Sequence, residues 1–252
     1  MDAGTYTAVS GGCVQFRKLE VVNNNLANVN TPGFKRQVLV GDVQTFDQTL
    51  AALQTGNPYA EADSELTPII TSIETKTDFT PGAIRATGNP LDAALRKAND
   101  FFVINMPDGP RYTRAGNFTL SNEGTLVTQD GFPVQGDGGP ITVTGPNVTI
   151  TPAGDVKANG QLAGRIQVVR ITDPQQLERT DGSRFRAPDG TAVIEAVAAD
   201  IEPAALEMSN VSAISGVIDL ITANRAFQMY AKSLETLDTL NSSAIGQLGR
   251  VR

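Results

Sequence analysis

The chain has 252 residues, of which 40% are hydrophobic and 19% charged, a composition that suits a folded protein and argues against wholesale disorder. Its formal net charge is −7 and lysine and arginine form no dense run, so we expect it not to bind nucleic acid. Histidine is absent, which excludes Ser-His and Cys-His nucleophile pairs and the usual zinc and iron ligand sets.

Apolar residues recur every three or four positions between residues 3 and 30, which predicts an amphipathic helix. The positions on this face are Tyr6, Val9, Cys13, Phe16, Leu19, Val22, Leu26 and Val29. The single cysteine, Cys13, allows no intrachain disulfide, and we interpret it as a small apolar packing residue. Asparagines crowd the end of the segment and weaken it, because their side chains compete for backbone hydrogen bonds.

The sequence Thr31-Pro32-Gly33 ends this helical segment. Pro32 lacks a backbone N–H and biases Thr31 toward an extended conformation, while Gly33 can adopt a positive φ at little cost. We interpret these three residues as a hinge that sets the direction in which the chain leaves the helix, with a simple helix stop as the alternative. Residues 37–65 follow as a connector, and from residue 42 their mixed polar pattern favours neither helix nor strand.

Between residues 66 and 207 the periodicity changes toward two, and turn-forming dipeptides recur about every ten residues, as in antiparallel sandwiches and irregular barrels. The predicted strands are 101–104, 111–114, 117–120, 125–128, 141–143, 148–150 and 166–169. Several acidic residues in this region directly precede glycine. The dipeptides Asp108-Gly109, Glu123-Gly124, Asp130-Gly131, Asp181-Gly182 and Asp189-Gly190 are therefore interpreted as turns.

A second helix is predicted over about residues 208–250, with apolar residues at the a and d positions of four heptads. This face comprises Leu220, Ala223, Phe227, Tyr230, Leu234, Leu237, Asn241, Ala244 and Leu248. Val217 and Ile221 widen it, and Asn241 occupies an a position, where a polar residue can fix the register. A helix of forty residues would be roughly 60 Å long, too long for the rest of this chain to cover, so we expect partners.

Helical ends and a strand-rich middle predict a mixed α and β (α+β) fold. We expect the terminal helices, in segments 1–36 and 208–252, to pair in a coiled-coil-like domain beside an antiparallel β-rich domain of residues 66–207. An alternative function is a carboxylate-dependent, Ca²⁺-assisted enzyme acting on carbohydrate, which would need two carboxyl groups facing each other across a cleft. Because histidine is absent and several acidic residues occur in turn dipeptides, we expect no catalytic residue, cofactor site or metal site.

No apolar segment approaches the roughly 20 residues that a membrane span requires, so we expect no membrane insertion. The first residues lack the basic and apolar regions of a secretory signal. These features alone predict a cytoplasmic protein.

Five segments resemble the signature elements of the flagellar rod and hook family. They are residues 24–36 (NNLANVNTPGFKR), 87–94 (TGNPLDAA), 112–118 (YTRAGNF), 206–211 (LEMSNV) and 224–227 (NRAF). They occur in the family's order and span residues 24 to 227. One departure is Asp100-Phe101-Phe102, where the family usually has Gly-Phe-Phe.

This resemblance implies a structural subunit, not an enzyme, with paired helices in the inner wall of a tubular, torque-transmitting rod and the β-rich domain in its outer layer. The implied partners are copies of itself, other rod proteins and the flagellar type III export apparatus. Export without a cleaved signal peptide would place the chain in the basal body, in the periplasmic space, and this replaces the cytoplasmic prediction. Length excludes the longer hook protein. The opening Met1-Asp2 followed by Tyr6-Thr7-Ala8, and the short connector, favour the proximal over the distal rod subunit.

Overall fold

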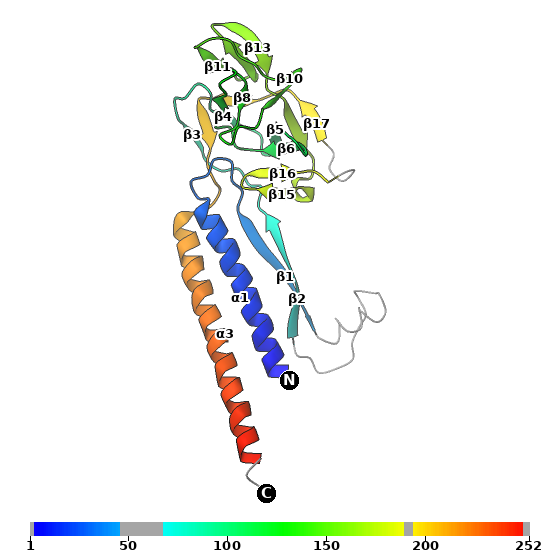
Figure 1. Ribbon diagram of the computed structural model, residues 1–252, viewed down its shortest axis with the longest axis vertical. Helices are drawn as coiled ribbons and strands as arrows, with labels where there is room; N and C mark the ends of the chain where they lie inside the picture. The colour runs from blue at the N-terminus through cyan, green and yellow to red at the C-terminus, as the bar shows by residue number, and fades with distance from the viewer. Residues whose placement is uncertain (1–2, 46–67, 189–193, 249–252) are drawn as a thin grey trace. The chain divides into compact units, whose positions relative to one another are not determined.

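The computed structural model describes residues 3–45, 68–188 and 194–248 (Figure 1). The chain forms two units, each assembled from separate stretches of sequence. The helical unit comprises Met1–Leu26, Gln37–Lys76 and Ala213–Arg252, and the β-rich unit comprises Ala27–Arg36 and Thr77–Ser212. The predicted mixed α and β fold class is confirmed, since one long helix lies at each end of the sequence and the strands lie between them.

The helical unit contains α1 (Ala3–Ala27) and α3 (Ala213–Leu248). The two helices run antiparallel, because Phe16 of α1 contacts Phe227 of α3 while Leu26 lies beside Gly216, near the start of α3. Helix α3 begins later than the predicted residue 208. The reason is that the residues just before it belong to a strand and a hydrogen-bonded turn of the β-rich unit.

The helical unit also contains a strand pair that the sequence analysis did not predict. Strand β1 (Gln37–Thr45) pairs with β2 (Pro68–Thr77) in a two-stranded sheet, and the intervening residues 46–67 lie outside the described residues. The side chain of Asn25 in α1 binds the start of β1 as a neighbouring strand would. Its amide nitrogen donates to the Gln37 carbonyl oxygen at 2.7 Å, and its amide oxygen accepts from the Gln37 N–H at 2.8 Å.

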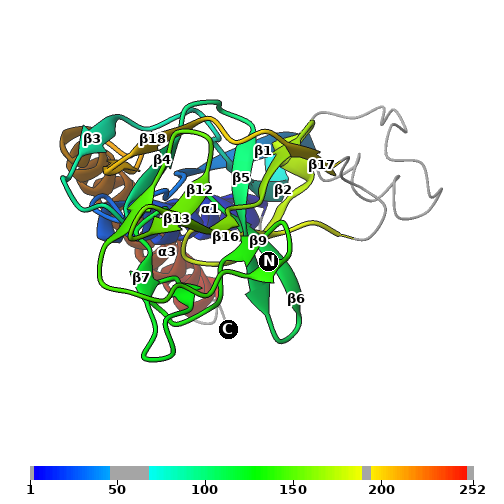
Figure 2. The same cartoon turned by 90° about the horizontal axis from the view of Figure 1, so that it is seen from above.

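A six-stranded antiparallel sheet forms the centre of the β-rich unit (Figure 2). In spatial order its strands are β15 (Glu178–Asp181), β16 (Arg184–Arg186), β6 (Gly109–Thr113), β5 (Asp100–Met106), β14 (Val168–Ile171) and β17 (Ile194–Val197). Strand β5 is buried on both faces, since Phe102 packs into one hydrophobic cluster while Phe101 and Val103 pack into another. Its uninterrupted apolar run over 101–104 is what burial of both faces of a strand requires.

The rest of the β-rich unit contains short strands, several of which contribute residues to the larger of these two clusters. They are β3 (Ile84–Ala86), β4 (Ala93–Leu95), β7 (Thr119–Leu120), β8 (Leu126–Val127), β9 (Gln135–Gly136), β10 (Gly139–Pro140), β11 (Val148–Ile150), β12 (Asp155–Ala158), β13 (Gln161–Arg165), β18 (Ile201–Pro203) and β19 (Ala205–Glu207). A 3-10 helix, η1 (Pro174–Gln176), precedes β15. The cluster is aliphatic apart from Phe102 and Phe118, whose rings meet edge to face at 5.1 Å.

Most predicted strands are present, with three exceptions. Strand β7 begins at Thr119 and β14 at Val168, each two residues later than the predicted 117–120 and 166–169. The predicted strand 141–143 is wrong: its only ladder contact among the described residues is an isolated bridge from Thr142 to Thr125, and Ile141 and Val143 serve instead as buried core residues. The turn interpretation of the acidic-glycine dipeptides is confirmed for Gly109, Gly124, Gly131 and Gly182, all with positive φ. The fifth, Asp189-Gly190, lies outside the described residues.

Candidate assembly surfaces and a buried ion-pair network

One face of α3 lies against α1, and its contacts involve the residues that the heptad pattern selects. The rings of Phe16 and Phe227 have centroids 6.1 Å apart and are tilted by 49°. Ala223 is fully buried. Gly11 of α1 lies directly under the ring of Tyr230, so closely that a Cβ at residue 11 would overlap the ring.

The remaining predicted face residues differ in burial. In α1, Val22 is buried, Leu19 and Leu26 are half-buried, and Val9 and Phe16 are exposed, Phe16 at 53%. In α3, Leu220, Tyr230 and Leu234 are half-buried, and Phe227 is at the margin of exposure. The side chains of Tyr6, Leu237, Asn241 and Leu248 lie outside the described residues, although their backbone is helical.

The exposed part of this helix pair forms a groove of about 460 Å³. It is lined by Val9, Gly12, Cys13, Phe16, Arg17, Glu20, Phe227 and Leu234. Only Arg17 and Glu20 are charged, and they pair with each other at 2.9 Å on the helix surface. The groove is therefore an apolar surface that the two helices of one chain do not fill.

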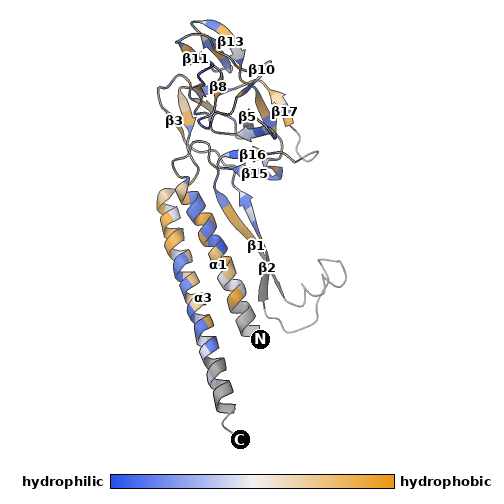
Figure 3. Ribbon diagram, viewed as in Figure 1, coloured by the Kyte–Doolittle hydropathy of each residue, from blue (hydrophilic) through white to orange (hydrophobic). Residues whose placement is uncertain are grey.

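Helix α3 carries a second apolar face, which is exposed. Its residues are Ile214, Val217, Ile218, Ile221 and Met229, with Ile214 as much as 77% exposed. At 3.6 residues per turn they lie on the side of α3 opposite the α1 contacts. Figure 3 shows the hydrophobic stretch at the start of α3. Val217 and Ile221, predicted to widen the first face, lie on this second face instead. All five residues fall outside the heptad a and d positions, so the heptad pattern does not reveal this face.

The predicted hinge residues belong to the β-rich unit. Gly33 has a φ of 67°, and its N–H donates to the carbonyl oxygen of Glu207 at 2.8 Å. A Cβ at this position would overlap the backbone of Arg114 and Ala115. Thr31 and Pro32 are half-buried, so this turn is packed into the unit instead of standing free.

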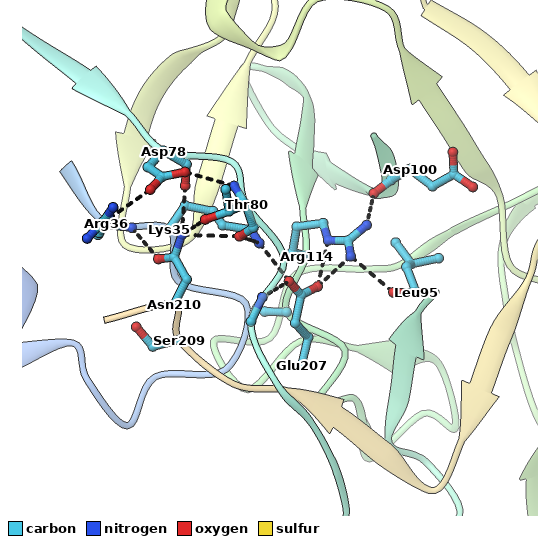
Figure 4. A network of polar contacts seen from close by, with 12 residues as sticks. Lys35, Arg36, Asp78, Thr80, Leu95, Asp100, Arg114, Glu207, Ser209 and Asn210 are labelled. Carbon is cyan, nitrogen blue, oxygen red and sulfur yellow. Dashed lines mark hydrogen bonds and ion pairs between the residues drawn. The ribbon is translucent and has the colours of Figure 1, made fainter. Parts of the chain in front are cut away.

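Next to this turn lies a buried network of charged residues that the sequence analysis did not identify (Figure 4). Glu207 accepts a hydrogen bond from Lys35 Nζ at 2.6 Å through one carboxylate oxygen and from Arg114 Nε at 2.7 Å through the other. The side chains of all three residues are only 1% exposed. The backbone N–H of Gly82 donates to the same carboxylate at 3.0 Å.

Backbone carbonyl groups bind the remaining donors of the two cations. Arg114 donates to the carbonyl oxygens of Leu95 at 3.0 Å and Lys97 at 2.6 Å, and also to that of Asp100. Two cations thus share one carboxylate in the interior. Burial lowers the pKa of Lys35, and the Glu207 carboxylate opposes this shift without cancelling it.

A second layer of polar contacts adjoins the buried one. The side-chain nitrogen of Asn210 donates to the Asp78 carbonyl oxygen at 2.8 Å and to that of Thr80 at 3.1 Å, and its side-chain oxygen accepts from the Arg36 N–H at 2.7 Å. Arg36 Nε also donates to the Asp78 carboxylate at 2.8 Å. Burial would raise the pKa of Asp78, but hydrogen bonds from Thr80 and Arg36 together hold it below its ordinary value.

These network residues come from the segments that resemble the family signatures. Lys35 lies in segment 24–36, Arg114 in 112–118, and both Glu207 and Asn210 in 206–211. In each segment the charged residue lies within a signature element. Charge alone did not reveal that the three side chains meet.

The carbohydrate-enzyme alternative requires two carboxyl groups that face each other across a cleft, and two carboxylates line a pocket of about 340 Å³ in the β-rich unit. These are Asp130 and Asp181, and Arg184 pairs with both, at 3.3 Å and 2.5 Å. Both carboxylates are well exposed and neutralised by one guanidinium, which is typical of a surface ion pair. An acid and base pair needs two contrasting environments, so this pocket gives the alternative no support.

Two further chemical features concern the part of the chain that the structure describes. No three cysteine, aspartate or glutamate side chains gather there in a way that could hold a metal ion. Neither described helix combines the length and apolarity needed to cross a membrane.

Comparisons with known proteins match three segments of the chain. Residues 6–35 match a family described as flagella basal body rod protein, residues 97–158 the flagellar hook protein FlgE/F/G D1 domain, and residues 202–247 the flagellar basal body rod FlgEFG protein C-terminal. The flagellar basal-body rod protein FlgF of Caulobacter vibrioides is 34% identical over the whole of both chains. FlgG of the same bacterium is 32% identical over 93% of this chain and 95% of its own. The flagellar hook-basal body complex protein FlhO of Bacillus subtilis is 30% identical over the whole of both chains.

Proposed function

The chain belongs to the family of flagellar basal-body rod proteins, and we propose that it is a structural subunit that polymerises through its terminal helices into the rod. In this role it contacts copies of itself and other rod proteins. The assembled rod acts as the drive shaft that transmits torque for motility. The single observation that carries this proposal is the second apolar face of α3.

That face is too extensive to be ordinary surface. Isolated exposed apolar residues are normal on soluble proteins, but a contiguous stripe marks an interaction site. Ile214, Ile218 and Ile221 are spaced by four and three residues, so they form one continuous stripe on the helix. Because α1 occupies the opposite side of α3, α1 cannot cover this stripe. A helix of a neighbouring subunit supplies the apolar surface that it lacks.

The groove between α1 and α3 also supports assembly. The groove beside Phe16 and Phe227 is open and apolar, so side chains from another subunit can fill it. Filling it removes apolar area from water at roughly 25 cal/mol per Å². Helix α1 has 25 residues and α3 has 36, so part of α3 has no α1 residue opposite it. Coiled-coil-like packing of the two helices is part of the proposal.

We further propose that this is the proximal rod subunit. In support, FlgF of Caulobacter vibrioides is 34% identical over the whole of this chain, against 32% over 93% of it for FlgG of the same bacterium. The subunit passes through the flagellar type III export apparatus without a cleaved signal peptide. It then assembles in the periplasmic space.

The experiment places a charge in the second face. Ile218→Asp is expressed in cells that lack the wild-type chain, and Ser233→Asp, which adds the same charge at an exposed polar position of α3, is the matched control. We expect Ile218→Asp to fold as the wild type does, by circular dichroism, but to be missing from isolated basal bodies and to abolish swimming. Ser233→Asp should enter basal bodies normally. Incorporation of Ile218→Asp at the wild-type level would refute the proposal.

A further inference from the structure

The chain passes between the two units at four places, after Leu26, Arg36, Lys76 and Ser212. Any force carried by the helices therefore enters the β-rich unit through these connections. Within the β-rich unit, the residues beside three of them are joined to one another. Lys35 and Arg36 precede the second crossing, Asp78 and Thr80 follow the third, and Glu207 and Asn210 precede the fourth.

The segment that ends at Arg36 (the first segment) and the segment that ends at Ser212 (the last segment) lie side by side and run in the same direction. The Gly33 N–H donates to the Glu207 carbonyl oxygen at 2.8 Å, and three residues further along both segments the Arg36 N–H donates to the Asn210 side-chain oxygen at 2.7 Å. Between these bonds, the Asn210 N–H donates to the Phe34 carbonyl oxygen at 3.4 Å.

This direction decides how the pair responds to force. Force from α1 reaches the first segment at its start, residue 27, whereas force from α3 reaches the last segment at its end, residue 212. Two parallel segments pulled at opposite ends are sheared, so all the bonds between them bear the force together. Antiparallel segments pulled from the same end would open one bond at a time.

We propose that Lys35, Arg36, Asp78, Arg114, Glu207 and Asn210 form a mechanical clamp, which ties together the chain segments through which the β-rich unit continues into the helices and resists shear between them. That the clamp bears torque in a rod rests on the proposed function. The clamp itself is a property of the isolated chain.

Burial gives the clamp its strength. The Lys35–Glu207 and Arg114–Glu207 pairs are shielded from water, so water cannot replace either partner as the segments begin to slide. Separating them leaves buried charges without partners, and breaking a buried pair in this way is strongly unfavourable. An exposed pair offers no such resistance, because each ion can be solvated as it separates. Arg114 adds a further attachment, since it also binds three carbonyl groups inside the unit.

The test is to pull single molecules of the full chain by tags added to its two termini. The helices separate first, and the force then reaches the β-rich unit at residues 27 and 212. We expect the wild-type unit to unfold in one high-force step. Glu207→Gln should lower that force and raise the unfolding rate at a fixed force by at least about tenfold, because Lys35 and Arg114 lose the carboxylate that they share.

The matched control is Arg165→Gln, which breaks an exposed ion pair of the same unit, away from the crossings. In this pair Arg165 Nε lies 2.7 Å from a carboxylate oxygen of Asp155. Arg165→Gln should leave the unfolding force unchanged. Asn210→Ala removes contacts of the clamp without leaving a buried charge, so it decides the matter if Glu207→Gln does not fold. The clamp is refuted if Asn210→Ala and Glu207→Gln unfold at the wild-type force, or if Arg165→Gln weakens the unit equally. Neither outcome depends on whether the chain enters a rod.

Discussion

The backbone N–H of Gly33 donates a hydrogen bond of 2.8 Å to the backbone carbonyl oxygen of Glu207, although most of the sequence separates the two residues. Two residues after Gly33, the Lys35 ammonium binds the side chain of the same glutamate. The turn that the sequence suggested as a hinge is thus fixed at two points to one buried residue. These two contacts hold Gly33 and Lys35 in place within the β-rich unit, and the hinge interpretation of Thr31, Pro32 and Gly33 stays a prediction.

This anchoring predicts an unusually large cost for a methyl group at residue 33. Gly33 has positive φ, which costs an L-residue about 1–2 kcal/mol, and its Cβ would also overlap backbone atoms that cannot move aside. Gly88 has a similar φ of 77° but open space around it. In urea unfolding, we expect Gly33→Ala to lower the free energy of unfolding by about 3 kcal/mol or more and Gly88→Ala by about 1 kcal/mol. Equal losses would show that residue 33 is not tightly packed.

A second prediction concerns Ala204, one of two non-glycine residues with positive φ in the part of the chain that the structure describes. Its φ of 52° is held by hydrogen bonds, since its N–H donates to the Asp92 carbonyl oxygen and its own carbonyl accepts from the N–H groups of Thr87 and Gly88. Ala204→Gly should therefore raise the free energy of unfolding by up to about 1 kcal/mol, as strain is removed. Ala196→Gly, in strand β17, is the control and should lower it. If both changes lower the free energy of unfolding, the backbone of Ala204 is not strained.

Local sequence patterns were enough to predict the two helices and the central strand. Three- and four-residue spacing located α1 and α3, and the apolar run at 101–104 located β5, because each pattern is contained in one short segment. Strand β1 could not be predicted in this way. Its start is fixed by the side chain of Asn25, twelve residues earlier, and its partner strand begins only at Pro68.

The ion-pair network was also beyond local reasoning. Lys35 and Glu207 are 172 positions apart, and nothing near either residue shows that it is buried. Lysine and glutamate are normally exposed, so a pattern-based analysis assigns both to the surface. The resemblance selected the right segments, but only the folded arrangement shows that three charged residues meet there. The start of α3 was misjudged for a related reason, since Glu207 belongs to a strand whose partner, β3, lies far away in sequence.

A third prediction follows from the lowered pKa of Lys35. Because the folded chain releases this proton at a lower pH than the unfolded chain, the unfolded state binds more protons between the two pKa values. The contribution of Lys35 to stability therefore rises with pH in that window. It is complete above the ordinary value of 10.5 and is lost as pH falls through the folded pKa.

The measurement compares wild type with Lys35→Met in urea unfolding from neutral pH to pH 10.5. Relative to the variant, the wild-type chain should gain stability as pH rises. Nuclear magnetic resonance of the Lys35 side chain should show directly that its ammonium titrates below 10.5 in the folded state. Titration at or above that value, or parallel stability profiles, would be inconsistent with this prediction.

The last prediction tests how α1 and α3 pair, by using two adjacent glycines as a matched pair. Both Gly11 and Gly12 lie within α1, where replacing glycine by alanine normally stabilises a helix by about 1 kcal/mol. At Gly12 the added Cβ would have only an ordinary contact, 3.8 Å from the Cβ of Tyr230. At Gly11 it would overlap the ring itself. The intrinsic gain is the same at both positions, so any difference between them reports on the packing of α1 against α3.

We therefore expect Gly12→Ala to increase helical circular dichroism and to raise the thermal midpoint of the helical signal in the full chain. Gly11→Ala should lower that midpoint, because the Tyr230 ring must move away from α1. Adding Tyr230→Ala should restore the gain in the Gly11→Ala background, since the obstructing ring is then absent. If Gly11→Ala stabilises the helices as much as Gly12→Ala does, the two helices do not pair in this register. The residues that line the groove would then not face one another in the subunit.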